Sequence, residues 1–312
     1  MAEGDVSDVE STGRESIELA TPTRSFVLGV ANEAGDIDAA ALYDAADAVG
    51  FSPTRIRLTL RRLVESGLVT VDGRGRGATI ALTAAGLDER RADLTWVAAA
   101  HRLDAGLDTW DGSWHLVSFE VPERHRAARD AVRETLVGLL CAPLSGGLYL
   151  SPWPIEPWIA PVAESVGVAD RLTFVVSSAI SVGGRRDPAG VAATAWPVET
   201  IAAGYATFVE QWASVIDDPP TETPDAVRVA FTASAEIEAL LRIDPVLPGV
   251  ALPPDFAGPE ARNVYRALIA VLRDHDVVAT ANVFGAYETA IVRALGQSAS
   301  EFWAEASRSS SS

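Results

Sequence analysis

The segment 50–82 constrains the fold more than any other part of the chain. Ser52 is placed to cap a helix that begins at Pro53, because serine accepts from free amides and proline suits the first helical position. Two short β-prone runs, 68–72 and 78–82, follow around a glycine-rich turn. The segment therefore predicts one basic helix followed at once by a hairpin.

Apolar periodicity predicts the helices around this segment. Phe26, Val27 and Val30 lie on one helical stripe, and Thr83 is placed to cap a helix that follows the hairpin. Helices are expected at about 25–32, 39–49, 52–66 and 84–100. Three short helices followed by a two-stranded wing is the order of a winged helix-turn-helix.

The helix 52–66 has two chemically different faces. At 100° per residue, the buried stripe is expected to hold Ile56, Leu60, Leu63 and Val64. The outward positions are Thr54, Arg55, Leu58, Arg61, Arg62 and Glu65. Arginine can bind guanine O6 and N7 together, and an apolar side chain can contact a thymine methyl, so this face suits a DNA major groove. Arg57, at the edge of the stripe, is interpreted as a phosphate contact or an intradomain ion pair.

In the predicted wing, Arg74 and Arg76 alternate with three glycines. Glycine lets the backbone approach a phosphate or a groove wall, and arginine favours narrow minor grooves. A dinucleotide-binding loop is excluded, because the glycine spacing differs and the segment leads into a strand. A solvated basic surface is the competing interpretation of both features. The position of the basic helix ahead of the hairpin favours DNA.

Taken alone, the net charge argues against DNA binding, since 43 acidic residues against 25 basic ones give a formal net charge of −18. The distribution changes that conclusion. Residues 51–91 hold eight arginines against four acidic residues, a net of +4. All 25 basic residues are arginine, so a Walker A lysine, a lysine Schiff base and Ser-x-x-Lys chemistry are excluded. The single Cys141 excludes an intramolecular disulfide and a cysteine-based zinc site.

The rest of the chain is expected to form two further units, which gives an α+β protein. In the second unit, the strand, helix, strand, helix and strand order within 111–195 predicts a ferredoxin-like α/β domain if one more strand is added. The expected divisions are an acidic disordered leader 1–22, a winged-helix domain 23–95, a linker helix 96–110, the central domain 111–195, a mostly helical domain 196–305 and a disordered tail 306–312. No apolar run approaches a membrane span or a secretory signal, so a cytoplasmic location without a membrane partner is expected.

Several features leave alternatives open. Glu120 ends the first central strand, where similar ferredoxin-like CRISPR adaptation endonucleases bind a metal, so a metal-dependent nuclease is the alternative function. No second acidic ligand and no convergent histidines are evident, and neither a metal nor a catalytic residue is expected. Six tryptophans could line an aryl pocket, although core positions are favoured: Trp110, Trp114, Trp153, Trp158, Trp196 and Trp212. Arg126, Arg129 and Arg133 could bind a CoA phosphate or pair with acidic residues of another subunit, and the pairing is favoured.

Three stretches of the chain resemble the PaaX family of transcriptional repressors. They are residues 50–68 with the wing and 82–86, the run Trp110-Asp-Gly-Ser-Trp114 continuing to Glu123, and residues 241–248 with 252–256. Their order and spacing match the family over about residues 23–290. The resemblance implies a repressor with three parts: an N-terminal winged helix, a central ferredoxin-like domain and a C-terminal helical domain. Phe256 departs from the pattern, because the family usually has tryptophan there.

The resemblance also implies partners. The family's effectors are aryl-acyl-CoA thioesters, above all phenylacetyl-CoA, which release the repressor from double-stranded operator DNA in phenylacetate-type operons. The resemblance carries DNA contact over to Arg57, Arg62 and the two wing arginines. Together with the outward face of the helix 52–66, the expected DNA-contact positions are Thr54, Arg55, Arg57, Leu58, Arg61, Arg62, Arg74 and Arg76. We expect a homodimer without a cofactor, and the sequence does not identify the effector-binding residues. A dimerisation or scaffold protein without DNA binding is a further alternative.

Overall fold

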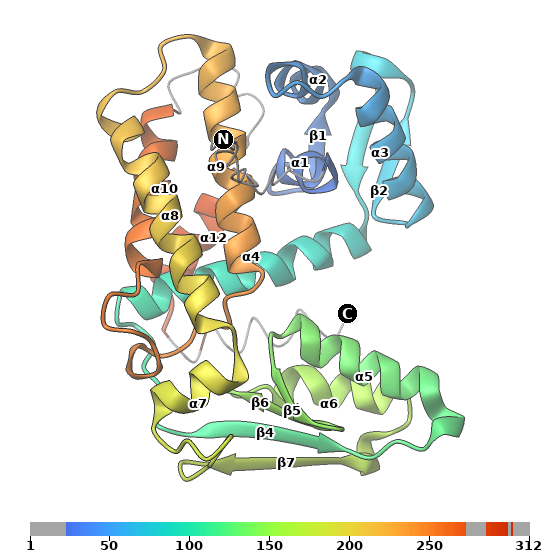
Figure 1. The fold of residues 1–312 in the computed structure, drawn as a ribbon. Coiled ribbons are helices and arrows are strands. Elements are labelled where there is room, and N and C mark those ends of the chain that lie inside the picture. Colours follow the sequence, from blue (N-terminus) through green and yellow to red (C-terminus); the bar gives the residue numbers. More distant parts are fainter. Residues whose placement is uncertain (1–22, 273–284, 299–300, 302–312) are drawn as a thin grey trace, which may run out of the picture.

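The computed structural model describes residues 23–272, 285–298 and 301 (Figure 1). The predicted leader 1–22 and tail 306–312 lie outside the described residues, as do parts of the predicted helical domain 196–305. The described parts combine helices with two small antiparallel sheets, so the α+β class is confirmed. No helix in these parts is both long and apolar enough to cross a membrane.

The N-terminal unit, which we define as residues 23–82, contains three helices and one small sheet. Its elements are α1 (Thr23–Gly29), β1 (Asp36–Asp38), α2 (Ala39–Ala48), α3 (Pro53–Glu65), β2 (Val69–Asp72) and β3 (Thr79–Leu82). The strands are antiparallel in the order β1-β3-β2. The predicted helices and hairpin are confirmed. Strand β1 was not predicted.

The predicted helix boundaries are also confirmed by the caps. Ser52 Oγ accepts a hydrogen bond from the Arg55 amide at 3.2 Å, at the start of α3. Gly67 follows the end of that helix with φ at 73°, a left-handed conformation that suits glycine. Thr83 Oγ1 accepts from the Gly86 amide at 3.1 Å.

The buried stripe of α3 is narrower than predicted. Ile56, Leu60 and Leu63 are buried, but Val64 is 44% exposed, so the expectation that it lies in the core is wrong. Val64 is one residue beyond Leu63 and therefore about 100° further round the helix. The sheet and the neighbouring helices cover only the sector centred on the other three side chains.

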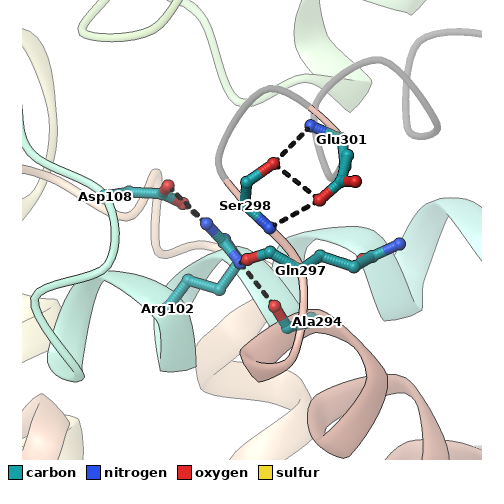
Figure 2. A network of polar contacts seen from close by, with 6 residues as sticks. All are labelled: Arg102, Asp108, Ala294, Gln297, Ser298 and Glu301. Atoms are coloured by element: carbon teal, nitrogen blue, oxygen red, sulfur yellow. Dashed lines mark hydrogen bonds and ion pairs between the residues drawn. The ribbon is translucent and has the colours of Figure 1, made fainter.

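Helix α4 (Ala84–Asp104) connects the N-terminal unit to the rest of the molecule. It is a single helix of 21 residues, so the expected division between residues 95 and 96 falls inside it. Arg102, near its end, is completely buried. Its Nε and Nη2 each lie 2.9 Å from a carboxylate oxygen of Asp108, and its Nη1 donates to the carbonyls of Ala294 and Gln297 (Figure 2). These bonds fix the end of α4 to the end of α12 (Gly285–Leu295).

The central domain is a four-stranded antiparallel sheet with helices on one face. Its elements are β4 (Trp114–Phe119), α5 (Arg126–Gly138), β5 (Ala142–Ser145), β6 (Leu148–Ser151), α6 (Glu156–Ser165) and β7 (Leu172–Ser177), with 3₁₀ turns at 123–125 and 169–171. The strand order β5-β6-β4-β7 and the βαββαβ sequence are those of a ferredoxin-like unit. Strand β5 is the further strand that the predicted order required.

The remaining helices are α7 (Pro188–Ala195), α8 (Val198–Asp217), α9 (Thr223–Leu241), α10 (Gly258–Leu272) and α12, with a 3₁₀ turn at 249–251. Helices α8, α9, α10 and α12 share one hydrophobic core with the N-terminal unit, whereas α7 packs with the central sheet. At the contact, Phe26 of α1 packs on Phe231 of α9, with ring centroids 4.5 Å apart. The N-terminal unit is therefore packed directly on the helical body.

The tryptophans occupy core positions. Trp114, Trp153, Trp158, Trp196 and Trp212 are buried, and Trp110 is half-buried. The indole N–H groups of Trp153 and Trp196 donate to the carbonyls of Val246 and Leu140, each at 2.9 Å. Their position favours the interpretation as core residues.

Candidate nucleic-acid interface

Helix α3 lies at the outer edge of the N-terminal unit. Figure 1 shows α1 and α2 between α3 and α9, so the outward face of α3 is directed away from the helical body. Thr54, Arg55, Arg61 and Arg62 are all exposed on that face, and Leu58 is 37% exposed. The structure thus brings the predicted groove-facing residues together on one accessible surface.

Arg55 is held in place by an aromatic ring that the sequence analysis did not single out. Its guanidinium carbon lies 4.4 Å from the centroid of the Phe51 ring, which is a cation–π contact. Phe51 in turn packs edge-on against Phe26 of α1 at 5.1 Å. The spacing of four residues between Phe51 and Arg55 was the available signal, although Phe51 precedes the helix. The core of the unit therefore supports the orientation of Arg55.

The other polar residues of α3 differ in how firmly they are engaged. Arg57 Nη2 donates to Thr54 Oγ1 at 3.1 Å, so these two predicted contact residues are bonded to each other. Arg61 Nε lies 3.6 Å from Glu65 Oε1, and both side chains are about two-thirds exposed. An exposed pair of this kind contributes little energy, so a phosphate or a base can displace it. Arg62 has no hydrogen bond or ion pair within the described residues.

The wing places its two arginines differently. Gly73 and Gly75 have φ of 90° and 63°, so the tip follows a backbone path that favours glycine. Arg74 is exposed and has no hydrogen bond or ion pair with any described residue. Arg76 Nη1 lies 2.6 Å from Asp44 Oδ1 on α2. Arg74 is therefore available to a partner, whereas Arg76 is already paired, although both members of that pair are more than half exposed.

Two arginines of the basic segment 51–91 have structural partners. Arg90 of α4 donates to the carbonyls of Ala31, Asn32 and Glu33 at 3.0, 2.7 and 3.0 Å, and so holds the chain that follows α1. Arg91 Nη1 lies 2.8 Å from Asp88 Oδ1. The positive charge that faces outward is consequently that of α3 and the wing.

The central domain offers little to the nuclease alternative. Glu120 is exposed just beyond the end of β4, and its amide donates to the Arg171 carbonyl at 3.3 Å. Among the described residues, no three His, Cys, Asp or Glu side chains are grouped so that they could hold a metal ion. The arginine row of α5 is partly engaged, because Arg129 pairs with Glu123 at 2.7 Å and Arg126 with Asp130 at 3.5 Å.

Comparison with known families decides the affiliation of the chain. The family model for the PaaX protein central Cas2-like domain matches residues 107–191, and that for the PaaX-like protein C-terminal domain matches residues 196–277. The chain belongs to the PaaX family. Membership in the PaaX family indicates a transcriptional regulator, and it does not support the nuclease alternative.

A solved structure shares the fold. The uncharacterized protein Rv0674 from Mycobacterium tuberculosis aligns with a TM-score of 0.50 at 22% sequence identity, over 82% of this chain and 97% of that chain. At this level of identity the likeness concerns the fold alone. The search of curated proteins gave no match.

Proposed function

We propose that this PaaX-family chain is a DNA-binding repressor whose N-terminal unit is a winged helix-turn-helix. In this proposal α3 enters the major groove, and the hairpin β2–β3 is the wing that contacts the flanking backbone. Arg55 and Arg61 bind base edges, with Leu58 against a thymine methyl. Arg62, Arg74 and Arg57 contact phosphates, and Arg76 joins them when its pair with Asp44 opens.

The observation that carries the proposal is that the Phe51 ring holds the side chain of Arg55 on the exposed face of α3. A long flexible side chain loses conformational entropy when it binds, and a side chain already held on Phe51 loses less of it. The same surface holds Arg62 and Arg74, which have no acidic partner among the described residues. A merely solvated helix face does not require a ring beneath its arginine.

The finer parts of the proposal concern assembly and regulation. A two-fold homodimer would place two copies of α3 roughly 34 Å apart, on half-sites about one helical turn or a multiple apart. The regulated genes are proposed to be those of aromatic-acid catabolism of the phenylacetate type. An aryl-acyl-CoA is proposed to release the protein from its operator by binding better to the DNA-incompetent state.

Selection of binding sequences from a random DNA pool, at a stated salt concentration, tests the proposal. We expect one palindromic sequence to be enriched, and affinity to fall steeply with salt. Arg55→Ala should change which sequence is enriched. The matched control is Arg228→Ala on α9, an exposed arginine paired with Asp225 three residues away, which should bind as the parent does. A pool that shows no enrichment with the parent protein contradicts DNA recognition.

A further inference from the structure

Helix α3 is a positive element in a chain that is otherwise acidic. It holds four arginines against Glu65 alone. Residues 1–22 hold six acidic residues against Arg14, and all other residues together hold 20 arginines against 36 acidic residues. The net charge of the molecule therefore repels an acidic segment, whereas α3 attracts it.

Three arginines of α3 form a surface that we call the basic face: Arg55, Arg61 and Arg62, all of which are exposed. Arg62 has no hydrogen bond or ion pair within the described residues. Arg61 Nε lies 3.6 Å from Glu65 Oε1, and both side chains are about two-thirds exposed. An exposed pair of this kind contributes little energy, so the carboxylates of another segment can replace Glu65 or add to it.

Apolar side chains lie among and beside these arginines. Leu58 is 37% exposed, and it shares a side of the helix with Arg55 and Arg62, which are three residues before it and four residues after it. Val64 is 44% exposed near the end of the helix. A partner that carries only charge leaves this apolar surface in water. A partner that mixes acidic and apolar residues covers both.

Residues 1–22 have this mixed composition. Their net charge is −5, and apolar residues stand next to acidic ones along the segment. The runs that combine them are Asp5-Val6, Asp8-Val9-Glu10 and Ile17-Glu18-Leu19. Runs of acidic residues commonly act as interaction segments. The composition of the segment therefore complements both the charge and the apolar surface of the basic face.

The segment joins the N-terminal unit beside the basic face. It is followed directly by α1, and α1 packs on α3 through their shared core (Figure 1). An extended chain of 22 residues reaches about 70 Å, whereas α3 is only about 20 Å long. Attachment through a short chain also gives an effective concentration on the order of mM, so even a weak contact is populated.

We propose that residues 1–22 bind the basic face of their own chain, and that DNA must displace them in order to bind there. Carboxylates of the segment pair with Arg61 and Arg62, and its apolar residues cover Leu58 and Val64. The α3 surface then has two alternative occupants, an acidic segment of the same chain and the DNA backbone.

The competition rests on the proposed DNA-binding function, and the contact does not. When the segment occupies the basic face, only the unoccupied fraction of the molecules is competent to bind DNA. The segment therefore lowers the affinity for every duplex by the same factor. Salt screens the attraction between the segment and α3, so this factor shrinks as the salt concentration rises.

Photo-crosslinking of the full-length protein tests the contact without DNA. Ser11→Cys places a thiol in the middle of the segment for labelling with benzophenone maleimide. The labelling is selective, because Cys141 is buried and burial raises the pKa of its thiol to about 12. We expect the crosslinks, mapped by mass spectrometry, to fall on α3 and to decrease at least fivefold in about 1 M salt, where charges are screened beyond about 3 Å.

Neutral variants of the basic face show whether its charge holds the segment. The double variant Arg61→Gln, Arg62→Gln should lose at least four-fifths of the crosslinks, and both side chains are exposed, so the fold is retained. The matched control is Arg228→Gln, an exposed arginine that pairs with Asp225 on α9, which should crosslink as the parent does. Crosslinks that the double variant retains overturn the contact. Crosslinks formed only between labelled protein and an isotope-labelled second copy overturn it as well.

Fluorescence anisotropy with the full-length protein tests the competition. The triple variant Asp5→Asn, Asp8→Asn, Glu10→Gln removes half of the acidic residues of the segment. We expect it to bind the selected sequence and an unrelated duplex at least threefold more tightly than the parent at about 50 mM salt. The gain should be the same factor for both duplexes, and it should be smaller at about 200 mM salt.

The matched control makes the same change of charge elsewhere. Asp217→Asn, Asp218→Asn, Glu222→Gln alters three exposed positions around the connection of α8 to α9, and its DNA affinity should stay within twofold of the parent. Equal gains in the two triple variants reflect net charge alone and overturn the competition, and so does an unchanged affinity in the segment variant. Crosslinks to α3 in a parent protein that binds no duplex overturn the proposed function and leave the contact standing.

Discussion

Arg262 of α10 forms a bidentate ion pair with Asp104 at the end of α4, with Nε 2.6 Å from Oδ2 and Nη2 2.8 Å from Oδ1. Its Nη1 also lies 3.5 Å from Asp244 Oδ2 and donates to the Tyr205 hydroxyl at 3.4 Å. Burial by itself lowers the pKa of a guanidinium, but the bonds to Asp104 raise the pKa of Arg262 overall. This one side chain therefore pairs with two carboxylates where α4 meets the helical body.

Replacing Arg262 should be strongly destabilising. Arg262→Met leaves the carboxylate of Asp244, which is only 3% exposed, without its cation. Breaking a buried pair by removing one partner typically costs about 3–5 kcal/mol, and we expect a loss of that size in the free energy of unfolding. Urea denaturation measures it. Arg228→Met, which breaks an exposed pair, should cost less than about 1 kcal/mol; equal losses in the two variants would contradict the role given to Arg262.

His101 should make the stability fall in mild acid. Burial, and next the nearby charge of Arg262, lower the pKa of His101 from 6.5 to about 4. Below pH 6.5 the unfolded chain binds a proton at this histidine, and the folded chain does not bind it until about pH 4. The stability contribution present at pH 7 is therefore lost as the pH falls through this window, by about 2 kcal/mol at pH 5.

Urea denaturation at pH 7 and pH 5 checks this dependence. His101→Leu removes the titrating group, and its stability should change less between the two pH values than that of the parent. The difference in pH dependence between the two proteins reports on His101 alone, because the carboxylates titrate in both. His101 Nε2 has no hydrogen-bond partner among the described residues, so the substitution leaves no bonding partner stranded. Identical pH dependence in both proteins would show that His101 does not titrate in this way.

The elements that could be predicted from sequence are those with a local signal. Helix α3 has a serine cap, a proline at its first position and a glycine after its end, and all three act as expected. Strand β1 has no such signal: it is three residues long and contains two aspartates, and it forms because Ile37 pairs with Ile80 of β3. Strand β5 contains Pro143, which is tolerated because β5 lies at the edge of the sheet.

The candidate site likewise has features that could be predicted from local sequence and features that could not. The outward face of α3 was predictable from the 100° rotation per residue, since it depends only on helix geometry. The partners of the interface arginines could not be predicted, because they come from elsewhere in the chain. Asp44, for example, pairs with Arg76 from 32 residues away in sequence. The cavity of about 230 Å³ between the N-terminal unit and the helical body could not be predicted for the same reason, because its lining combines residues from Arg24 to Tyr287. Only the three-dimensional packing brings them together.

Gly86 in the first turn of α4 should resist substitution. A Cβ there would lie 2.2 Å from the Leu68 carbonyl oxygen, which belongs to the backbone and cannot move aside. We expect Gly86→Ala to destabilise the protein by about 1–3 kcal/mol, although alanine is the better helix former by about 1 kcal/mol. Gly138→Ala in α5 meets nothing within 4 Å and should be neutral or slightly stabilising. Thermal melting compares the two, and a tolerated alanine at position 86 would contradict the close approach.

The last prediction divides the arginines of the proposed DNA interface by their role. Arg55 and Arg61 are proposed to bind bases, so Arg55→Ala and Arg61→Ala should change which sequences are preferred, at about 1–3 kcal/mol for each altered position. Arg74 is proposed to contact a phosphate. Arg74→Ala should therefore weaken all sequences alike and reduce the slope of log affinity against log salt by about 0.9.

Anisotropy titrations of the selected sequence and of single-base variants, at several salt concentrations, measure both effects. Arg91→Ala is the matched control, because Arg91 is paired with Asp88 on α4 and is not proposed to contact DNA. It should leave both the preference and the salt slope unchanged. If Arg55→Ala and Arg61→Ala weaken binding equally for all sequences, those arginines contact the DNA phosphates and not the bases. An altered sequence preference for Arg74→Ala would in turn place the wing against the bases.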